Sequence, residues 1–270
     1  MPDALRIDQA NLVALWVEAI LYGAFLILFG ASIYVLLFLK RASWLNKMMA
    51  LVSVLMFALI TAHIVCDVVR AMRAFTQSSN AMDFYGDIAE PSEWAKTIIY
   101  TLLSLLGDAM VVFRCWIVWG GNPLVMVIPC TLLLLSVAMA ALVCQAISAL
   151  TPAQEIFTED LARWLLPFFA LTFVTNNLCT LLIAGRICWT TRQTQQYTSG
   201  DSRLWRVIVM LIESAALYSI ALIAMIGTFV AGSNAQYITI DALCPIIGIA
   251  VRLFEIQDFE QPLILIFIPV

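Results

Sequence analysis

The sequence is poor in charge, and especially poor in lysine and histidine. Charged residues make up 12% of its 270 residues, whereas about a quarter of an average soluble domain is charged. Hydrophobic residues make up 63%, so too few polar residues remain to cover a water-facing surface. The only lysines are Lys40, Lys47 and Lys96, and the only histidine is His63. This composition predicts a membrane protein and excludes a retinal Schiff base on the last helix and a three-histidine zinc site.

The sequence also lacks several motifs that would indicate a known function. The net charge is −4 and Lys and Arg form no run, so no patch would neutralise phosphates and we expect no nucleic-acid partner. The Gly-x-Ser-x-Gly elbow of a serine hydrolase does not occur. The seven cysteines lie in or beside apolar segments without a Cys-x-x-Cys pair, which predicts that they pack as small apolar residues. We expect no cofactor.

Seven apolar segments are long enough to cross a bilayer, which needs about 20 residues per helix. They cover residues 12–39, 45–69, 97–119, 123–148, 161–189, 204–231 and 237–254. The predicted fold is an all-α bundle of seven transmembrane helices. It comprises an extracellular N-terminal segment (1–11), the transmembrane domain (12–256) and a C-terminal tail (257–270).

The distribution of basic residues predicts the orientation. With seven spans, nine of the 14 Lys and Arg residues fall on one side and five on the other. The cytosolic side carries the excess, so we expect the N-terminus outside and the C-terminus in the cytosol, with the protein in the plasma membrane. The basic loop from Arg186 to Arg206 is then a candidate site for a cytosolic signalling partner. The outer loops are acidic, which favours attraction of a cationic ligand.

Ionisable residues inside the spans are functional candidates, because a charge at the bilayer centre costs about 2.5–3.5 kcal/mol on insertion scales. Polar residues follow three of the helices at helical spacing, and such stripes predict a polar cavity that opens to the outside. Side chains that only hold helices together would give the same pattern. The ligand-cavity candidates are Glu18, His63, Asp67, Thr101, Ser104, Asp108, Thr172 and Asn176.

Two residues on the second predicted helix have the spacing of metal ligands. His63 and Asp67 stand at i and i+4, an acceptable spacing for two ligands on one helix. A third ligand would have to come from another helix, from Glu18 or Asp108, and nothing in the sequence places it there. We therefore predict no metal site.

Arg114 and Glu213 suggest a contact between the third and sixth helices. Both lie at a similar depth from the predicted inner boundary, about 8–10 Å at the rise of a helix. An arginine and a carboxylate at the same depth can form a bidentate ion pair. The prediction is either a static staple or a latch that opens on activation.

Short motifs along the predicted third to seventh helices carry a resemblance. They are Gly107-Asp108, Arg114-Cys115-Trp116-Ile117-Val118-Trp119, Asn122, Pro129, Thr175-Asn176-Asn177, Gly185-Arg186-Ile187, Ile212-Glu213-Ser214, Tyr218 and Ile246-Ile247-Gly248-Ile249. In these motifs the sequence resembles a multi-copy family of seven-span integral membrane proteins of mushroom-forming (basidiomycete) fungi. The resemblance implies the seven-helix fold and marks Asp108, Arg114, Asn176 and Glu213 as pattern positions, but it implies no activity. The segment after Ala250 departs from the family pattern.

Three hypotheses about function follow. The sequence favours a receptor-like protein that binds a small ligand in an outward-facing polar cavity, with the lipid bilayer as its other partner. The alternative is an intramembrane enzyme such as a small terpene cyclase, in which Asp108 or Glu18 would be a protonated acid in a water-poor pocket. The third is a proton-coupled transporter that uses the buried acids as a relay.

Overall fold

The computed structural model describes residues 5–36, 44–77, 81–86, 91–148, 159–194 and 202–260. These residues form seven long helices and one short one, and they contain no strand. The predicted all-α fold with seven spans is confirmed. The helices are α1 (Ile7–Tyr34), α2 (Trp44–Thr76), α3 (Ala81–Gly86), α4 (Pro91–Val118), α5 (Pro123–Ser148), α6 (Glu159–Thr194), α7 (Ser202–Val230) and α8 (Ala235–Glu260).

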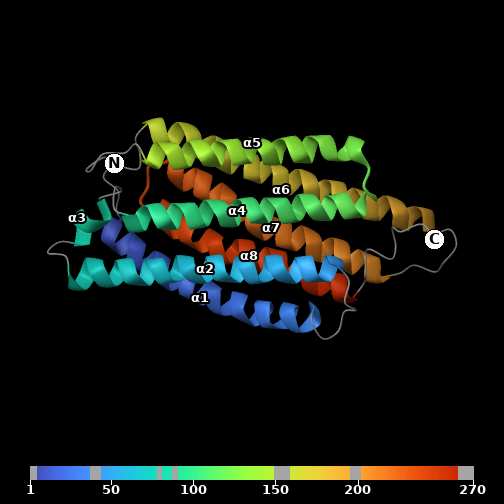
Figure 1. Ribbon diagram of the computed structural model, residues 1–270, viewed down its shortest axis with the longest axis horizontal. Helices are drawn as coiled ribbons and strands as arrows, with labels where there is room; N and C mark the ends of the chain where they lie inside the picture. The colour runs from blue at the N-terminus through green and yellow to red at the C-terminus, as the bar shows by residue number, and fades with distance from the viewer. Residues whose placement is uncertain are drawn as a thin grey trace.

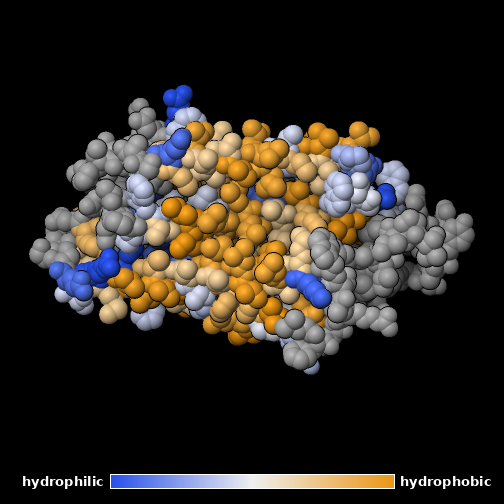
Figure 2. Space-filling view, viewed as in Figure 1, coloured by the Kyte–Doolittle hydropathy of each residue, from blue (hydrophilic) through white to orange (hydrophobic). Residues whose placement is uncertain are grey.

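The outer surface of the bundle is apolar along its middle. Large hydrophobic side chains are exposed there, including Ile20, Ile27 and Leu134. Figure 2 shows hydrophobic residues covering the centre of one face, with hydrophilic residues toward the two ends. All seven long helices are long and apolar enough to span a membrane. The fold is therefore that of an integral membrane protein, in which the exposed apolar surface faces lipid.

The helices lie nearly parallel to one long axis (Figure 1). Helix α1 packs mainly against α8 and also against α2, whereas α4 is central and contacts α2, α5, α6 and α8. The short helix α3 lies at one end of the bundle, which we call the α3 end. The turn between α4 and α5 lies at the opposite end, which we call the Gly120 end.

Two glycines and an asparagine form the α4–α5 turn. Gly120 and Gly121 have φ values of 60° and 75°, which residues with a side chain rarely adopt. The Gly121 N–H donates to the Trp116 carbonyl at 3.0 Å, closing the last turn of α4. Asn122 Oδ1 then accepts from the Leu124 N–H at 3.1 Å and caps α5.

The helix ends differ from the predicted boundaries by a few residues. Helix α1 begins at Ile7, inside the segment 1–11 that we expected to precede the membrane domain. Asp8 in the first turn favours this start, because a carboxylate is stabilised near a helix N-terminus. Helix α8 continues to Glu260, beyond the predicted boundary at 256. Helix α3 was not predicted, and residues 261–270 of the expected tail lie outside the described residues.

Helices α1, α2 and α8 interlock around a glycine. A Cβ atom on Gly248 of α8 would lie 2.5 Å from Ile60 Cδ1 of α2 and 2.7 Å from the ring of Phe25 of α1. Such distances are well below an ordinary carbon–carbon contact of about 3.5–4.0 Å. Only glycine therefore permits this approach of the three helices.

Candidate functional site

The predicted polar stripe on α2 is buried and faces the bundle. His63, Asp67 and Arg70 follow one another at i, i+4 and i+7, and their exposed fractions are 0%, 7% and 3%. This spacing places all three on one helix face. The buried polar face of α2 therefore contains two of the predicted cavity residues, His63 and Asp67, together with Arg70.

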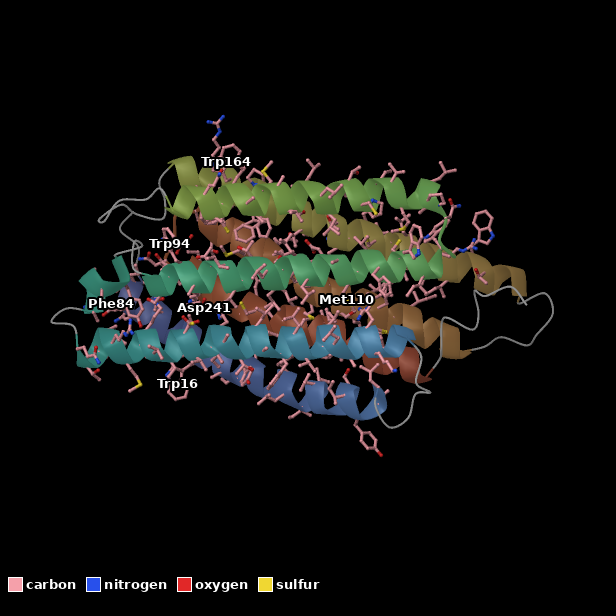
Figure 3. All side chains as sticks on the ribbon, in the orientation of Figure 1. Trp16, Phe84, Trp94, Met110, Trp164 and Asp241 are labelled. Carbon is pink, nitrogen blue, oxygen red and sulfur yellow. The ribbon has the colours of Figure 1, made fainter. Side chains whose placement is uncertain are left out.

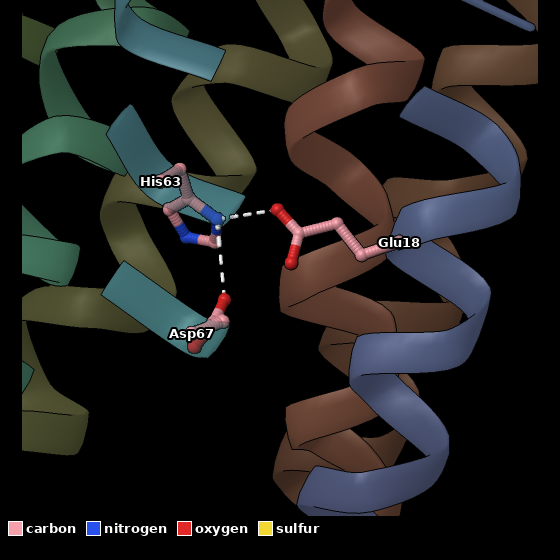
Figure 4. Close-up of side chains that lie close together, drawn as sticks. All are labelled: Glu18, His63 and Asp67. Carbon is pink, nitrogen blue, oxygen red and sulfur yellow. Dashed lines mark hydrogen bonds and ion pairs between the residues drawn. The ribbon is translucent and has the colours of Figure 1, made fainter. Parts of the chain in front are cut away.

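Helix α1 supplies a carboxylate to this face. Glu18 is fully buried, and its Oε1 lies 2.6 Å from His63 Nδ1. Asp67 Oδ2 lies 3.4 Å from the same nitrogen. Figure 4 shows both carboxylates directed toward this side of the imidazole ring. The ligand atoms of the three residues all lie within 4.8 Å of one another.

Helices α4 and α8 complete the group. Lys96 Nζ of α4 lies 2.6 Å from Asp67 Oδ1 and 2.6 Å from Asp241 Oδ1 of α8. Lys96 is 4% exposed and Asp241 is 1% exposed. In Figure 3, Asp241 lies toward the same end of the bundle as Phe84 and Trp94, away from Met110. We call Glu18, His63, Asp67, Lys96 and Asp241 the α3-end cluster.

A second ion pair lies beside the α3-end cluster. Arg70 of α2 pairs with Glu93 of α4, and its guanidinium lies 5.5 Å from the centre of the Tyr85 ring. Tyr85 belongs to α3, outside the spans, and burial raises the pKa of its hydroxyl while Arg70 opposes that rise. Helix α3 therefore packs over the charged end of the bundle through an aromatic ring that stays neutral.

The α3-end cluster has more carboxylates than cations. Glu18, Asp67 and Asp241 bring three negative charges when ionised, Lys96 brings one positive charge, and a neutral His63 brings none, which gives −2. Arg70 and Glu93 cancel each other. An unbalanced charge is costly to bury, because it loses its hydration. The cluster therefore requires either added protons or a bound cation.

Several polar atoms of the cluster have unmet hydrogen-bonding capacity. Within the described part of the chain, no donor reaches Glu18 Oε2, and no hydrogen-bond partner reaches His63 Nε2. Asp67 Oδ2 lies 3.4 Å from His63 Nδ1 and forms no hydrogen bond to a described residue. Buried polar atoms are normally hydrogen-bonded, so Glu18 Oε2 and Asp67 Oδ2 are available to a further group at the cluster.

The remaining cavity candidates lie elsewhere. Asp108 is buried at 1% exposure, and its Oδ2 accepts a hydrogen bond from Thr172 Oγ1 at 3.0 Å. Asp108 Oδ1 has no partner among the described residues. Ser104 is buried one turn away, and Thr101 Oγ1 donates to the Thr97 carbonyl of its own helix.

Asn176 belongs to a small cavity between α4, α6, α7 and α8. The cavity has a volume of about 40 Å³, and its polar lining comes from Arg114, Asn176, Thr180, Ser214 and Tyr218. Since a water molecule needs about 10–15 Å³ on this measure, the space holds about three. Of the eight predicted cavity residues, Asn176 lines this space, whereas Glu18, His63 and Asp67 belong to the α3-end cluster. The candidates thus form separate groups rather than one cavity.

The predicted ion pair between Arg114 and Glu213 is wrong. Arg114 is buried, and its Nη2 donates to the Val251 carbonyl of α8 at 3.0 Å. Glu213 is exposed on the bundle surface, and no ion pair joins these two described residues. Arg114 and Glu213 lie at similar depths in the membrane, but their side chains point in different directions. Ser214 faces the cavity, and its neighbour Glu213 is turned about 100° away from it around the helix.

A second buried charged group lies toward the Gly120 end. Arg252 and Glu255 of α8 form an ion pair and are 0% and 1% exposed. Ser32 of α1 donates to Glu255 Oε2, and Ser53 of α2 lies 3.1 Å from Glu255 Oε1. We call these four residues the Gly120-end cluster. Its two charged residues, Arg252 and Glu255, lie near the C-terminal end of α8.

Sequence reasoning missed Asp241, Lys96 and the Gly120-end cluster. Asp241 was within reach, because it is an acid inside the last predicted span. Lys96 was counted only as a basic residue near a membrane boundary. Arg252 and Glu255 stand at i and i+3, a spacing that permits an ion pair on one helix.

Comparison with known proteins gives no relative. No family model, no curated protein and no solved structure matches this chain.

Proposed function

We propose that this protein is a receptor-like seven-helix membrane protein that binds a small ligand at the α3-end cluster. The N-terminus and the α3 end face outward, and the C-terminus and the Gly120 end face the cytosol. The excess negative charge of the cluster favours a cationic ligand, and the acidic outer loops would attract such a ligand.

One observation carries this proposal: three helices, α1, α2 and α8, contribute residues to both buried polar clusters. Glu18 and Ser32 lie on α1, His63 and Ser53 on α2, and Asp241 and Glu255 on α8. The paired positions are 10 to 14 residues apart, or about 15–21 Å along a helix. Ligand binding that moves one helix at the α3 end would therefore change the hydrogen bonds at the other end.

The packing between the clusters supports transmission. Phe25, Ile60 and Gly248 fit together without room for an added methyl group. Packed interfaces of this kind shift between discrete arrangements rather than deforming gradually. A rigid contact between the two clusters is what a receptor needs in order to pass on a change.

The cytosolic partner is proposed to bind near the loop from Arg186 to Arg206. The Arg186 guanidinium lies 5.2 Å from the centre of the Trp119 ring, so it also helps to pack α6 against α4. Residues 195–201 lie outside the described residues.

A double-mutant cycle tests the coupling between the clusters. Asp241→Asn and Glu255→Gln are made singly and together in the purified full chain, and the free energy of unfolding is measured in detergent. Distant, independent sites add within about 0.3–0.5 kcal/mol, so we expect a larger interaction energy. The control pair is Asp108→Asn with Glu255→Gln, which should be additive because Asp108 lies on α4. Additivity in the first pair would contradict the receptor proposal.

An intramembrane enzyme is the second candidate, and Asp108 is the observation that favours it. One oxygen of this buried acid has no partner among the described residues, and it lies in a region rich in buried aromatic rings. The described cavity nearby holds only about three waters, which is too little for a terpene substrate. Asp108→Asn would abolish turnover in an enzyme while leaving the folded protein intact.

A further inference from the structure

We infer that Glu18, His63 and Asp67 bind a divalent transition-metal ion of the zinc class. The inference rests on the proposed use of the α3-end cluster as the ligand site, and it names the ligand's chemistry. It differs from the sequence prediction of no metal site because the fold supplies the third ligand from α1.

The first argument is the donor set. One imidazole nitrogen and two carboxylate oxygens, from two different helices, lie within 4.8 Å of one another and face one side of the His63 ring (Figure 4). Calcium and magnesium prefer sites made of oxygen ligands alone. A nitrogen with two oxygens suits zinc and its neighbours in the transition series.

The second argument is distance. Zinc bonds of about 2.0–2.2 Å in a tetrahedral site place the ligand atoms about 3.3–3.5 Å apart. His63 Nδ1 and Asp67 Oδ2 are 3.4 Å apart, which fits without movement. His63 Nδ1 and Glu18 Oε1 are 2.6 Å apart because they share a hydrogen bond. A metal ion would replace that hydrogen, and a shift of Glu18 by under about 1 Å would complete the geometry.

The third argument is charge. The α3-end cluster carries −2 when its carboxylates are ionised and His63 is neutral, so one divalent ion makes it neutral. Lys96 and the metal would use different oxygens of Asp67, because Lys96 Nζ bonds to Oδ1 and leaves Oδ2 toward His63. The unpartnered Glu18 Oε2 offers a further acceptor at the site.

Three protein ligands leave one coordination position open. Structural zinc sites are normally closed by four protein ligands, whereas zinc sites that react or bind keep a position for water or another molecule. An open coordination position at the α3 end suits a protein that senses the metal, or one in which the metal holds a second small ligand.

The test uses Zn²⁺ itself as the probe. The full chain is purified in detergent, stripped with a chelator, and titrated with ZnCl₂ while bound metal is counted by mass spectrometry. We expect one equivalent of Zn²⁺. His63→Gln, Glu18→Gln and Asp67→Asn should each weaken binding by more than about 100-fold, since even outer partners of metal ligands cost about 10–100-fold. Glu93→Gln is the matched control, because Glu93 is a neighbouring, partly buried acid that pairs with Arg70.

Co²⁺ gives a readout that needs no variant. The unmodified protein loaded with Co²⁺ should show the intense visible bands of a four-coordinate site. Failure to bind either metal, or binding that His63→Gln leaves unchanged, would overturn the inference. Protons would then balance the negative charge of the α3-end cluster. Binding with an additive Asp241 and Glu255 cycle would keep the metal site and remove the receptor proposal. A coupled cycle without metal binding would do the reverse.

Discussion

Replacing Gly248 by alanine should loosen the contact between the three helices that build both clusters. The new Cβ would lie 2.5 Å from Ile60 Cδ1 and 2.7 Å from two ring atoms of Phe25. An ordinary contact is about 3.5–4.0 Å, so each neighbour would have to retreat by about 1 Å. Overpacking of this kind typically costs about 1–3 kcal/mol, and we expect Gly248→Ala to lower the free energy of unfolding by that amount.

Unfolding in detergent, followed by circular dichroism during heating, measures this effect. Gly23→Ala is the control on α1, because no atom lies within 4 Å of its added Cβ. That variant should be as stable as the unmodified protein or more stable by up to about 1 kcal/mol. Ile60→Val removes the closest clashing atom, so combining it with Gly248→Ala should recover part of the loss. Equal stability of Gly248→Ala and the unmodified protein would refute the interlock.

Three further predictions concern the charged residues and the orientation. Lys96→Met should lower the free energy of unfolding by about 3–5 kcal/mol, because it leaves Asp67 and Asp241 without their ammonium partner; Lys47→Met at an exposed position should change it by less than about 0.5 kcal/mol in the same measurement. Arg114→Met should destabilise the protein through the lost bond to the Val251 carbonyl, whereas Glu213→Gln should not; rescue of Arg114→Glu by Glu213→Arg in the same unfolding experiment would contradict the observed geometry. A glycosylation sequon introduced at Ser79 should be modified in cells and one at Thr198 should not, as a mobility shift on a gel would show; the opposite result would reverse the orientation.

The fold was largely predictable from the sequence. Apolar length alone sets the seven spans, because backbone groups in lipid must be paired within a helix. Gly120 and Gly121 suit the positive φ values of the turn between α4 and α5, because glycine adopts them readily. Helix α3 was not predictable in the same way, since it is six residues long and is held by tertiary contacts such as that between Tyr85 and Arg70.

The site was predictable only along single helices. The spacing of His63, Asp67 and Arg70 places them on one face of α2 whatever surrounds that helix. Which residues meet across helices depends on how each helix is rotated and packed. The depth of a residue in the membrane, which the sequence does give, determines neither of these. Depth alone therefore suggested the wrong partner for Arg114, and it gave no reason to join Lys96 with Asp241.

A distance measurement between spin labels tests the central claim, that the α3 end and the Gly120 end are coupled. The seven cysteines are replaced, and labels are placed at the exposed positions Lys47 on α2 and Leu124 on α5. Asp241→Asn at the far end should shift the Lys47–Leu124 distance by about 1–2 Å, the scale of helix movements in switching proteins. The reference distance between Leu124 and Trp189, on α5 and α6, should stay the same. An unchanged Lys47–Leu124 distance distribution in the folded variant would contradict the coupling.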